Sequence, residues 1–129
     1  MNRIKLHDKW FKICTPAQEL DVAVQNVANQ LNKDLKDVNE PVFLSVLNGS
    51  FMFTSDLMKK LDIVADLMFI KLSSYCGTES TGKVKQVFGL NRSVEGKTVI
   101  VVEDIVETGN TIEELYKILT EAGAANIKI

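Results

Sequence analysis

Residues 98–111 read TVIVVEDIVETGNT and join a predicted strand to a predicted helix. Thr98 to Val102 is a run of β-branched residues, which is typical of a strand covered on both faces. Apolar residues then recur at helical spacing from about Thr111 to Ala122, and Gly123 stands where a helix terminator belongs. A buried strand that leads directly into a helix favours an α/β fold with a parallel sheet.

The same alternation of helix and strand runs through the first half of the chain. Thr15 is expected to cap a helix whose apolar residues recur on one face: Leu20, Val24, Val27, Leu31 and Leu35. Strands are predicted at 42–47 and 67–72, with a helix over 51–61 between them. Residues 126–129 look like the beginning of a further strand.

The chain is expected to form a single domain, residues 1–129, with a mostly parallel sheet and helices on both faces. A length of 129 residues is usual for one domain, and 46% hydrophobic with 25% charged residues is typical of a globular protein. A stretch rich in Ser, Thr and Gly predicts a mobile loop at about 73–83, before a weaker strand at 84–90.

The overall charge argues against broad electrostatic binding. Lys and Arg number 15 and Asp and Glu 17, giving a net charge of −2, so no nucleic-acid or membrane partner is expected. The N-terminus lacks the long apolar run of a signal peptide, and nothing reaches transmembrane length. Cys14 and Cys76 lie far apart and His7 is the single histidine, so we expect reduced thiols and a cytoplasmic protein.

Ligands of a parallel sheet bind beyond the carboxyl ends of its strands, which here selects three loops, at 48–49, 73–83 and 103–111. In the last of these, residues 108–111 are small or hydroxylated. Backbone N–H groups at the start of the following helix can therefore face a phosphate. An anion-binding site is therefore predicted in the loop at 103–111.

Three carboxylates lie beside that anion site: Glu103, Asp104 and Glu107. They would repel an unscreened phosphate. The conflict disappears if the ligand also brings sugar hydroxyls and a divalent cation, because carboxylates accept hydrogen bonds from a ribose and bind Mg²⁺. The alternative to a ligand site is that residues 108–111 only form a turn that caps the helix, beside acids of the kind that commonly end strands. This interpretation does not explain why three acids lie together.

Residues 77–83, GTESTGK, have the glycines and the lysine of a nucleotide-binding P-loop. That motif needs Ser or Thr after the lysine to reach Mg²⁺, and it leads into a helix. Here Val84 follows the lysine and the next residues favour a strand. We therefore reject an ATPase interpretation.

Residues 101–111 closely resemble the phosphoribosyl-pyrophosphate (PRPP) motif of type I phosphoribosyltransferases, in the hypoxanthine (guanine) branch. Two further blocks are similar to that branch. Residues 47–53 match its pyrophosphate loop, and Ser74-Tyr75 with residues 77–84 match its flexible catalytic loop. The resemblance runs from the Thr15 helix to Ile129 and implies the type I phosphoribosyltransferase fold.

The resemblance implies how PRPP would be held. Glu103 and Asp104 would hold the ribose 2′ and 3′ hydroxyls, directly and through Mg²⁺. The 5′-phosphate would be wrapped by four consecutive residues: Thr108, Gly109, Asn110 and Thr111.

It also implies roles around the reacting bond. Asn48 and Gly49 would contact pyrophosphate, where the family often has a non-proline cis peptide. Glu107 would face purine N7 as the acid/base group. Ser74 and Tyr75 would lie on the loop that closes over pyrophosphate and excludes water.

The chain departs from the family pattern in three places. Glu107 stands where an aspartate is usual, and Asn48 stands where a lysine or arginine is usual. Family members also continue with a strand carrying a lysine, an aromatic and an aspartate that serve the purine. These residues are absent here, so the resemblance implies a C-terminally incomplete member.

The expected function is purine salvage: transfer of the phosphoribosyl group of PRPP to a 6-oxopurine, hypoxanthine or guanine, giving IMP or GMP and pyrophosphate. Mg²⁺ is the expected cofactor, and a homodimer or homotetramer the expected assembly. One alternative is a non-catalytic PRPP or nucleotide-binding regulator with the same fold, which would have no need of Ser74, Tyr75 or Glu107. Another is an inactive structural piece that exposes the edge of its sheet.

Overall fold

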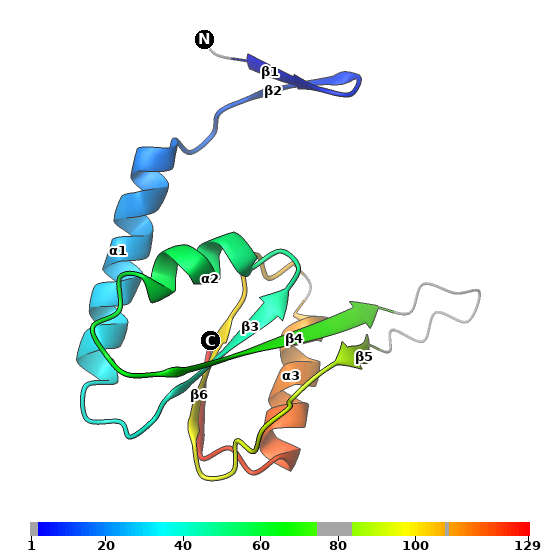
Figure 1. Ribbon diagram of the computed structural model, residues 1–129. Helices are drawn as coiled ribbons and strands as arrows, with labels where there is room; N and C mark the ends of the chain where they lie inside the picture. Colours follow the sequence, from blue (N-terminus) through cyan, green and yellow to red (C-terminus); the bar gives the residue numbers. More distant parts are fainter. Residues whose placement is uncertain (1–2, 75–83, 108) are drawn as a thin grey trace.

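The computed structural model describes residues 3–74, 84–107 and 109–129 (Figure 1). Its three helices are α1 (Ala17–Asp34), α2 (Phe51–Met58) and α3 (Asn110–Glu121). Its strands are β1 (Arg3–Leu6), β2 (Lys9–Lys12), β3 (Val42–Leu47), β4 (Asp66–Ser74), β5 (Val84–Phe88), β6 (Thr98–Val102) and β7 (Asn126–Lys128). Within these residues, no helix is long and apolar enough to cross a membrane.

Five strands form one sheet in the order β5-β4-β3-β6-β7. All neighbours are parallel except β4 and β5, which are antiparallel. The register pairs Val42 of β3 with Val99 of β6, and Ser45 with Val102. The prediction of a mostly parallel α/β sheet is confirmed, and the carboxyl ends of β3 and β6 lie side by side.

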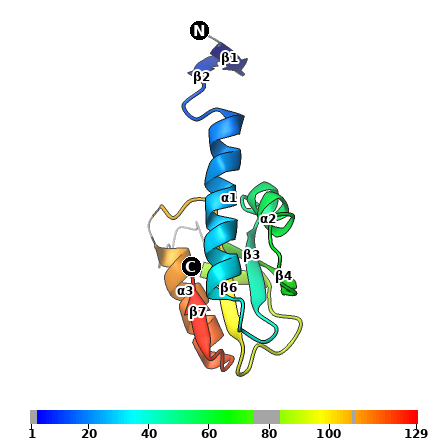
Figure 2. The ribbon, with the colours of Figure 1, turned by 90° about the vertical axis from the view of Figure 1, so that its left-hand side faces the viewer.

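The two faces of the sheet are covered by different helices (Figure 2). Alternate residues of β3 and β6 point to opposite faces, as the pleat requires. Phe43, Ile100 and Val102 pack with α1 and α2. On the other face, the buried cluster joins strand residues to α3: Val42, Leu44, Val46, Val99, Val101, Leu115 and Leu119. The double covering explains why both strands are apolar apart from Ser45 and Thr98.

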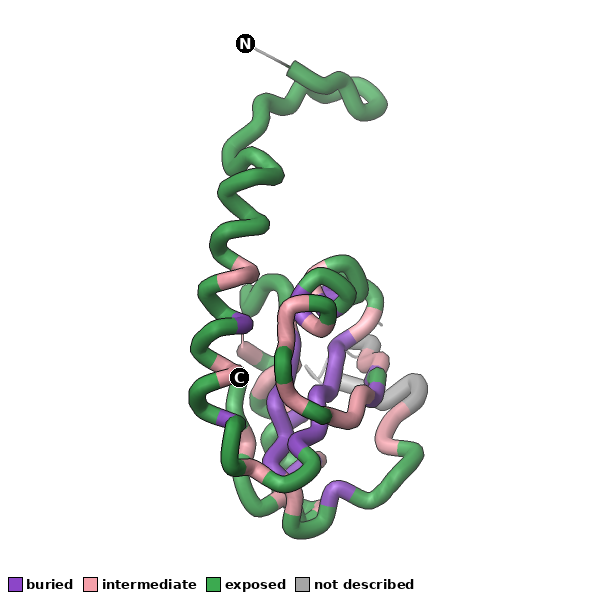
Figure 3. The backbone as a smooth tube through the Cα atoms, turned by 60° about the vertical axis from the view of Figure 1, so that its left-hand side comes forward, coloured by how far each residue is buried: buried purple, intermediate pink, exposed green. Residues whose placement is uncertain are grey.

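Helix α1 differs from its sequence prediction at the N-terminal end. The helix begins at Ala17, Pro16 occupies the N-cap position and no side chain caps it, so the prediction of Thr15 as the cap is wrong. Two residues of the apolar face expected on this helix are exposed: Val27 (41%), which lines a groove, and Leu20 (54%), whose end of the helix extends past the sheet. The reason for the exposure of Leu20 is length: 18 helical residues span about 27 Å, whereas the six residues of β3 span about 20 Å. Only the second half of α1 reaches the sheet (Figure 3).

An N-terminal hairpin, β1 and β2, stands away from the sheet and was not expected from the sequence (Figures 1 and 2). Its strands pair with Leu6 opposite Lys9, so His7 and Asp8 form a two-residue turn. All of residues 3–12 are exposed. Arg3 to Leu6 alternate between charged and apolar residues, which is a strand signal, but Lys9 to Lys12 do not alternate strictly, so the pairing was not recognised.

The remaining elements match their predictions to within a few residues. The helix expected over 51–61 ends at Met58, and the strand expected over 84–90 ends at Phe88. Strand β4 is longer than the predicted 67–72, because two further residues at its end pair with β5. The helix expected from Thr111 begins one residue earlier.

Candidate active site

The turn between β3 and α2 has two exposed residues, Asn48 and Gly49, directly above the buried Ser50. The peptide bond between Leu47 and Asn48 is cis, as the resemblance implies. Phe51 N donates to the Asn48 carbonyl at 3.4 Å, and α2 begins at that point. The strand therefore ends in a compact turn that presents backbone groups to solvent.

Gly49 lies against the carboxylate of Asp104, which follows the neighbouring strand β6. A Cβ atom on Gly49 would lie 2.7 Å from Asp104 Oδ2 and 2.9 Å from Oδ1, closer than real Cβ contacts. A larger residue at this position would therefore force the Asp104 carboxylate or the turn to move. The structure thus brings the predicted pyrophosphate turn and the predicted ribose acids together at one edge of the sheet.

Glu103, at the end of β6, has an unusual environment. Its Oε2 atom is buried and, among the described residues, it is the one buried side-chain oxygen or nitrogen without a hydrogen-bond partner. Partial burial raises the pKa of Glu103 above its usual 4.5, and the adjacent charge of Asp104 and a hydrogen bond with it raise the pKa further.

These two carboxylates fit the cation and hydroxyls that the resemblance implies. A buried carboxylate oxygen without a partner is costly, and a ribose hydroxyl or a divalent cation would satisfy it. No group of three or more His, Cys, Asp or Glu side chains gathers into a metal site within the described residues. Glu103 and Asp104 would therefore bind Mg²⁺ together with oxygens of the ligand.

The start of α3 provides the second part of the site. Gly109 is its N-cap residue with φ +81°, a conformation that favours glycine, and an added Cβ would meet nothing within 4 Å. Glu113 N donates to the Gly109 carbonyl at 2.9 Å, which closes the first turn. Asn110 and Thr111 form that turn, so their backbone lies at the positive end of the helix dipole.

The structure leaves part of the predicted site undescribed. Tyr75 and Thr108 lie outside the described residues, as does most of the loop expected at 73–83. Ser74 is the last residue of β4, where its backbone pairs with Val84 of β5. Glu107 is exposed in the loop after β6.

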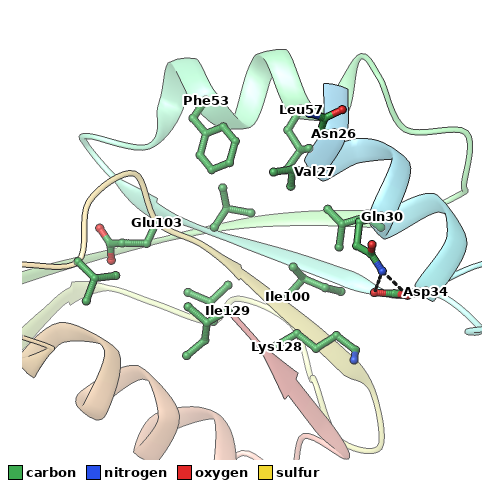
Figure 4. A pocket seen from close by; sticks show the side chains of 14 residues that line it. Asn26, Val27, Gln30, Asp34, Phe53, Leu57, Ile100, Glu103, Lys128 and Ile129 are labelled. Carbon is green, nitrogen blue, oxygen red and sulfur yellow. Dashed lines mark hydrogen bonds between the residues drawn. The ribbon is translucent and has the colours of Figure 1, made fainter. Parts of the chain in front are cut away.

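A groove of about 760 Å³ opens beside Glu103, and sequence reasoning missed it (Figure 4). It lies between α1, α2, β6 and the last residues of the chain, with a largely apolar lining. Glu103 stands at one end, and Asp34 and Lys128 stand at the other. Gln30 donates to both carboxylate oxygens of Asp34, at 2.9 and 3.0 Å. The apolar spacing that includes Val27 predicted one wall of the groove, on α1. The opposite wall comes from β6 and the last residues of the chain, which lie far from α1 in sequence.

Comparison with known proteins agrees with this geometry. The phosphoribosyl transferase domain family matches residues 15–129. The hypoxanthine-guanine phosphoribosyltransferase of Staphylococcus aureus is 33% identical over 126 residues, covering 96% of this chain and 69% of that protein. The bifunctional protein TilS/HprT of Listeria monocytogenes is also 33% identical over 125 residues, and this chain spans 19% of its length.

Solved structures give the same result. A hypoxanthine phosphoribosyltransferase from S. aureus superposes with a TM-score of 0.83 at 33% identity, covering 90% of this chain and 63% of that one. The Trypanosoma cruzi hypoxanthine phosphoribosyltransferase in complex with its product IMP gives 0.76 at 36% identity, covering 85% and 63%.

The parallel sheet, the paired acids and the glycine that begins α3 define an α/β domain with a candidate phosphate site at the carboxyl ends of its strands. The chain belongs to the phosphoribosyltransferase family, in its hypoxanthine-guanine branch. It spans less than two thirds of the S. aureus chain in the solved structure.

Proposed function

We propose that this protein transfers the phosphoribosyl group of PRPP to hypoxanthine or guanine, giving IMP or GMP and pyrophosphate. The observation that carries the proposal is the contact of Gly49 with the Asp104 carboxylate. It supports the proposal because the turn assigned to pyrophosphate lies next to the acids assigned to the ribose, with the start of α3 at the same end of the sheet.

In this proposal the substrate lies across the ends of β3 and β6. Asn48 and Gly49 hold the pyrophosphate, and Glu103 and Asp104 accept hydrogen bonds from the ribose hydroxyls. The 5′-phosphate binds at the start of α3, to the four residues Thr108, Gly109, Asn110 and Thr111. The partnerless Oε2 of Glu103 supports the ribose assignment, because a hydroxyl would supply its missing donor.

The reaction breaks the bond between ribose C1 and pyrophosphate and forms the bond between C1 and purine N9. Glu107 accepts the proton from N7 as that bond forms. Glu103 and Asp104 would hold Mg²⁺, which when bound supplies positive charge against the leaving pyrophosphate. Ser74 and Tyr75 belong to the loop that closes over the substrate, so that water does not hydrolyse PRPP.

The remaining parts of the proposal concern the protein as a whole. We infer a cytoplasmic homodimer or homotetramer without a nucleic-acid or membrane partner. The net charge of −2 supports the absence of polyanion binding. Exposed apolar side chains on the hairpin, among them Ile4, Trp10 and Phe11, support self-association. Analytical ultracentrifugation would reveal a monomer if the assembly is wrong.

Calorimetric titration of the chain with PRPP, with and without Mg²⁺, tests the binding part of the proposal. We expect binding that strengthens with the metal. A folded chain that binds neither PRPP nor ribose 5-phosphate would overturn it. An assay for IMP and GMP then tests turnover, and metal-dependent PRPP binding without either product would favour the regulator.

A further inference from the structure

Three hydroxyl groups are buried directly beneath the pyrophosphate turn. Ser45 lies on β3, Ser50 at the start of α2 and Thr54 one turn further on; all are at most 2% exposed. Ser45 Oγ lies 2.7 Å from Ser50 Oγ and 2.7 Å from Thr54 Oγ1. The Ser50 hydroxyl also donates to the carbonyl of Val46. The three side chains therefore form one connected network.

The network runs in one direction, because each hydroxyl has a single proton to donate. Ser50 gives its proton to the Val46 carbonyl, so it accepts from Ser45. Ser45 then has none left for Thr54 and accepts from it. The chain of donors runs from Thr54 through Ser45 and Ser50 to Val46, so a missing hydroxyl leaves its partner unsatisfied in the core.

The network ends on the backbone that forms the turn. The Ser50 amide also points to the Val46 carbonyl, at 3.4 Å, so side chain and backbone both close the segment from Val46 to Ser50. Thr54 N donates to the Ser50 carbonyl at 2.8 Å, which fixes the first turn of α2. Asn48 and Gly49 are the exposed residues inside the closed segment. The network is therefore hydrogen-bonded at both ends of the segment that carries Asn48 and Gly49.

Packing alone gives no reason for hydroxyls at these three positions. The surrounding core is apolar, with Phe43 and Leu57 nearly fully buried close by in sequence. Burying a hydroxyl costs free energy unless it is hydrogen-bonded, and an apolar residue would fill the space at lower cost. A fully satisfied polar network, by contrast, fixes a single geometry. The free-energy cost of burying these hydroxyls is explained if the Val46–Ser50 turn must keep one geometry.

We propose that Ser45, Ser50 and Thr54 are positioning residues for pyrophosphate, acting through the Val46–Ser50 turn. They hold the backbone of Asn48 and Gly49 against Asp104. The inference rests on the proposed function, because it takes this turn as the pyrophosphate site. Its test separates the pyrophosphate part of the ligand from the ribose phosphate part.

Thr54→Val removes one hydroxyl and keeps the volume, and Thr54→Ser restores the hydroxyl. The control is Thr98→Val at the opposite end of β6, where the buried hydroxyl accepts from Asn126 Nδ2 at 3.4 Å. Each variant is titrated with Mg·PRPP and with ribose 5-phosphate, which lacks pyrophosphate. Thr54→Val should weaken PRPP binding roughly fivefold to tenfold, because a turn that no longer has a single geometry must be ordered when pyrophosphate binds. Its affinity for ribose 5-phosphate should not change, and Thr54→Ser should bind both ligands as the wild type does.

Equal PRPP affinity in Thr54→Val and Thr98→Val, at a temperature where both are folded, would overturn the inference while leaving the proposed function intact. Loss of both ligands in the wild type would instead overturn the proposed function. If Thr54→Val does not fold, Ser50→Ala takes its place. Backbone amide resonances of Asn48 and Gly49 in that unliganded variant should shift relative to the wild type, and unchanged resonances would contradict the positioning role.

Discussion

Two loops lie at the same edge of the sheet, and they differ in whether their buried polar groups have hydrogen-bond partners within the protein. The turn after β3 rests on a buried hydroxyl network in which every proton has an acceptor. The loop after β6 holds a buried Glu103 oxygen without a partner, and Ile105 and Val106 are more than half exposed. The first loop is complete without ligand. The second has a polar group without a partner and exposed apolar side chains, which fits the proposed ribose site.

The largest effect should come from the loop after β6. Glu107→Gln keeps the size of the side chain but removes its ability to take a proton. We expect kcat for IMP formation to fall about 100-fold, the usual range for a lost acid/base group. PRPP affinity should stay unchanged. Glu113→Gln, which removes the same charge from the first turn of α3, is the control, and an equal kcat in both variants would refute the role of Glu107.

A smaller effect should come from the contact between the two loops. Gly49→Ala places a Cβ 2.7 Å from Asp104 Oδ2, so the turn or the carboxylate must move. We expect PRPP affinity to fall about 30-fold in calorimetry, because displacements near 1 Å are costly in a positioned site.

The double variant Gly49→Ala with Asp104→Ala sharpens the contact test. If the clash with the carboxylate causes the loss, the two changes should be clearly non-additive, because removing Asp104 removes the clash. Additive losses of PRPP affinity would mean that Gly49 acts independently of Asp104.

Asp104→Ala alone should have a more modest effect. We expect Mg·PRPP affinity to fall about tenfold, with less dependence on the metal, because one of two carboxylate ligands is lost. Asp56→Ala, which removes an exposed carboxylate from α2, is the matched control. Unchanged metal dependence in Asp104→Ala would exclude Asp104 as a ligand.

The smallest effect concerns stability without ligand. The raised pKa of Glu103 means that the folded chain holds this proton more tightly than the unfolded chain, so stability falls as pH rises from 4.5 through the folded pKa. Glu103→Gln removes that loss and should raise Tm at neutral pH by about 2 °C, a small gain because the group is partly exposed. At about pH 4 the two proteins should melt together.

Glu95→Gln, an exposed control, should leave Tm unchanged at both pH values. A neutral-pH Tm of Glu103→Gln equal to that of the wild type would show that the loop after β6 carries no unmet charge. The contrast between the two loops would then be lost.

Much of the fold followed from local patterns. The buried runs at β3 and β6 and the glycine before α3 were recognisable because strand burial and helix starts depend on neighbours in sequence. Three features were missed or wrong: the β1–β2 hairpin, the start of α1 at Ala17, and the exposure of Leu20. The exposure of Leu20 depends on how far α1 extends past the sheet, which no pattern within the helix encodes.

The sequence by itself determined the order of the helices and of the strands of the five-stranded sheet, the acids that end β6 and the residue types of the candidate phosphate site. Only the tertiary structure decided that Gly49 touches Asp104, that one Glu103 oxygen is buried without a partner, and that a groove opens beside it. The physical reason is register. Pairing Val42 with Val99 places the ends of two strands side by side although they lie more than fifty residues apart, and no local pattern encodes that distance.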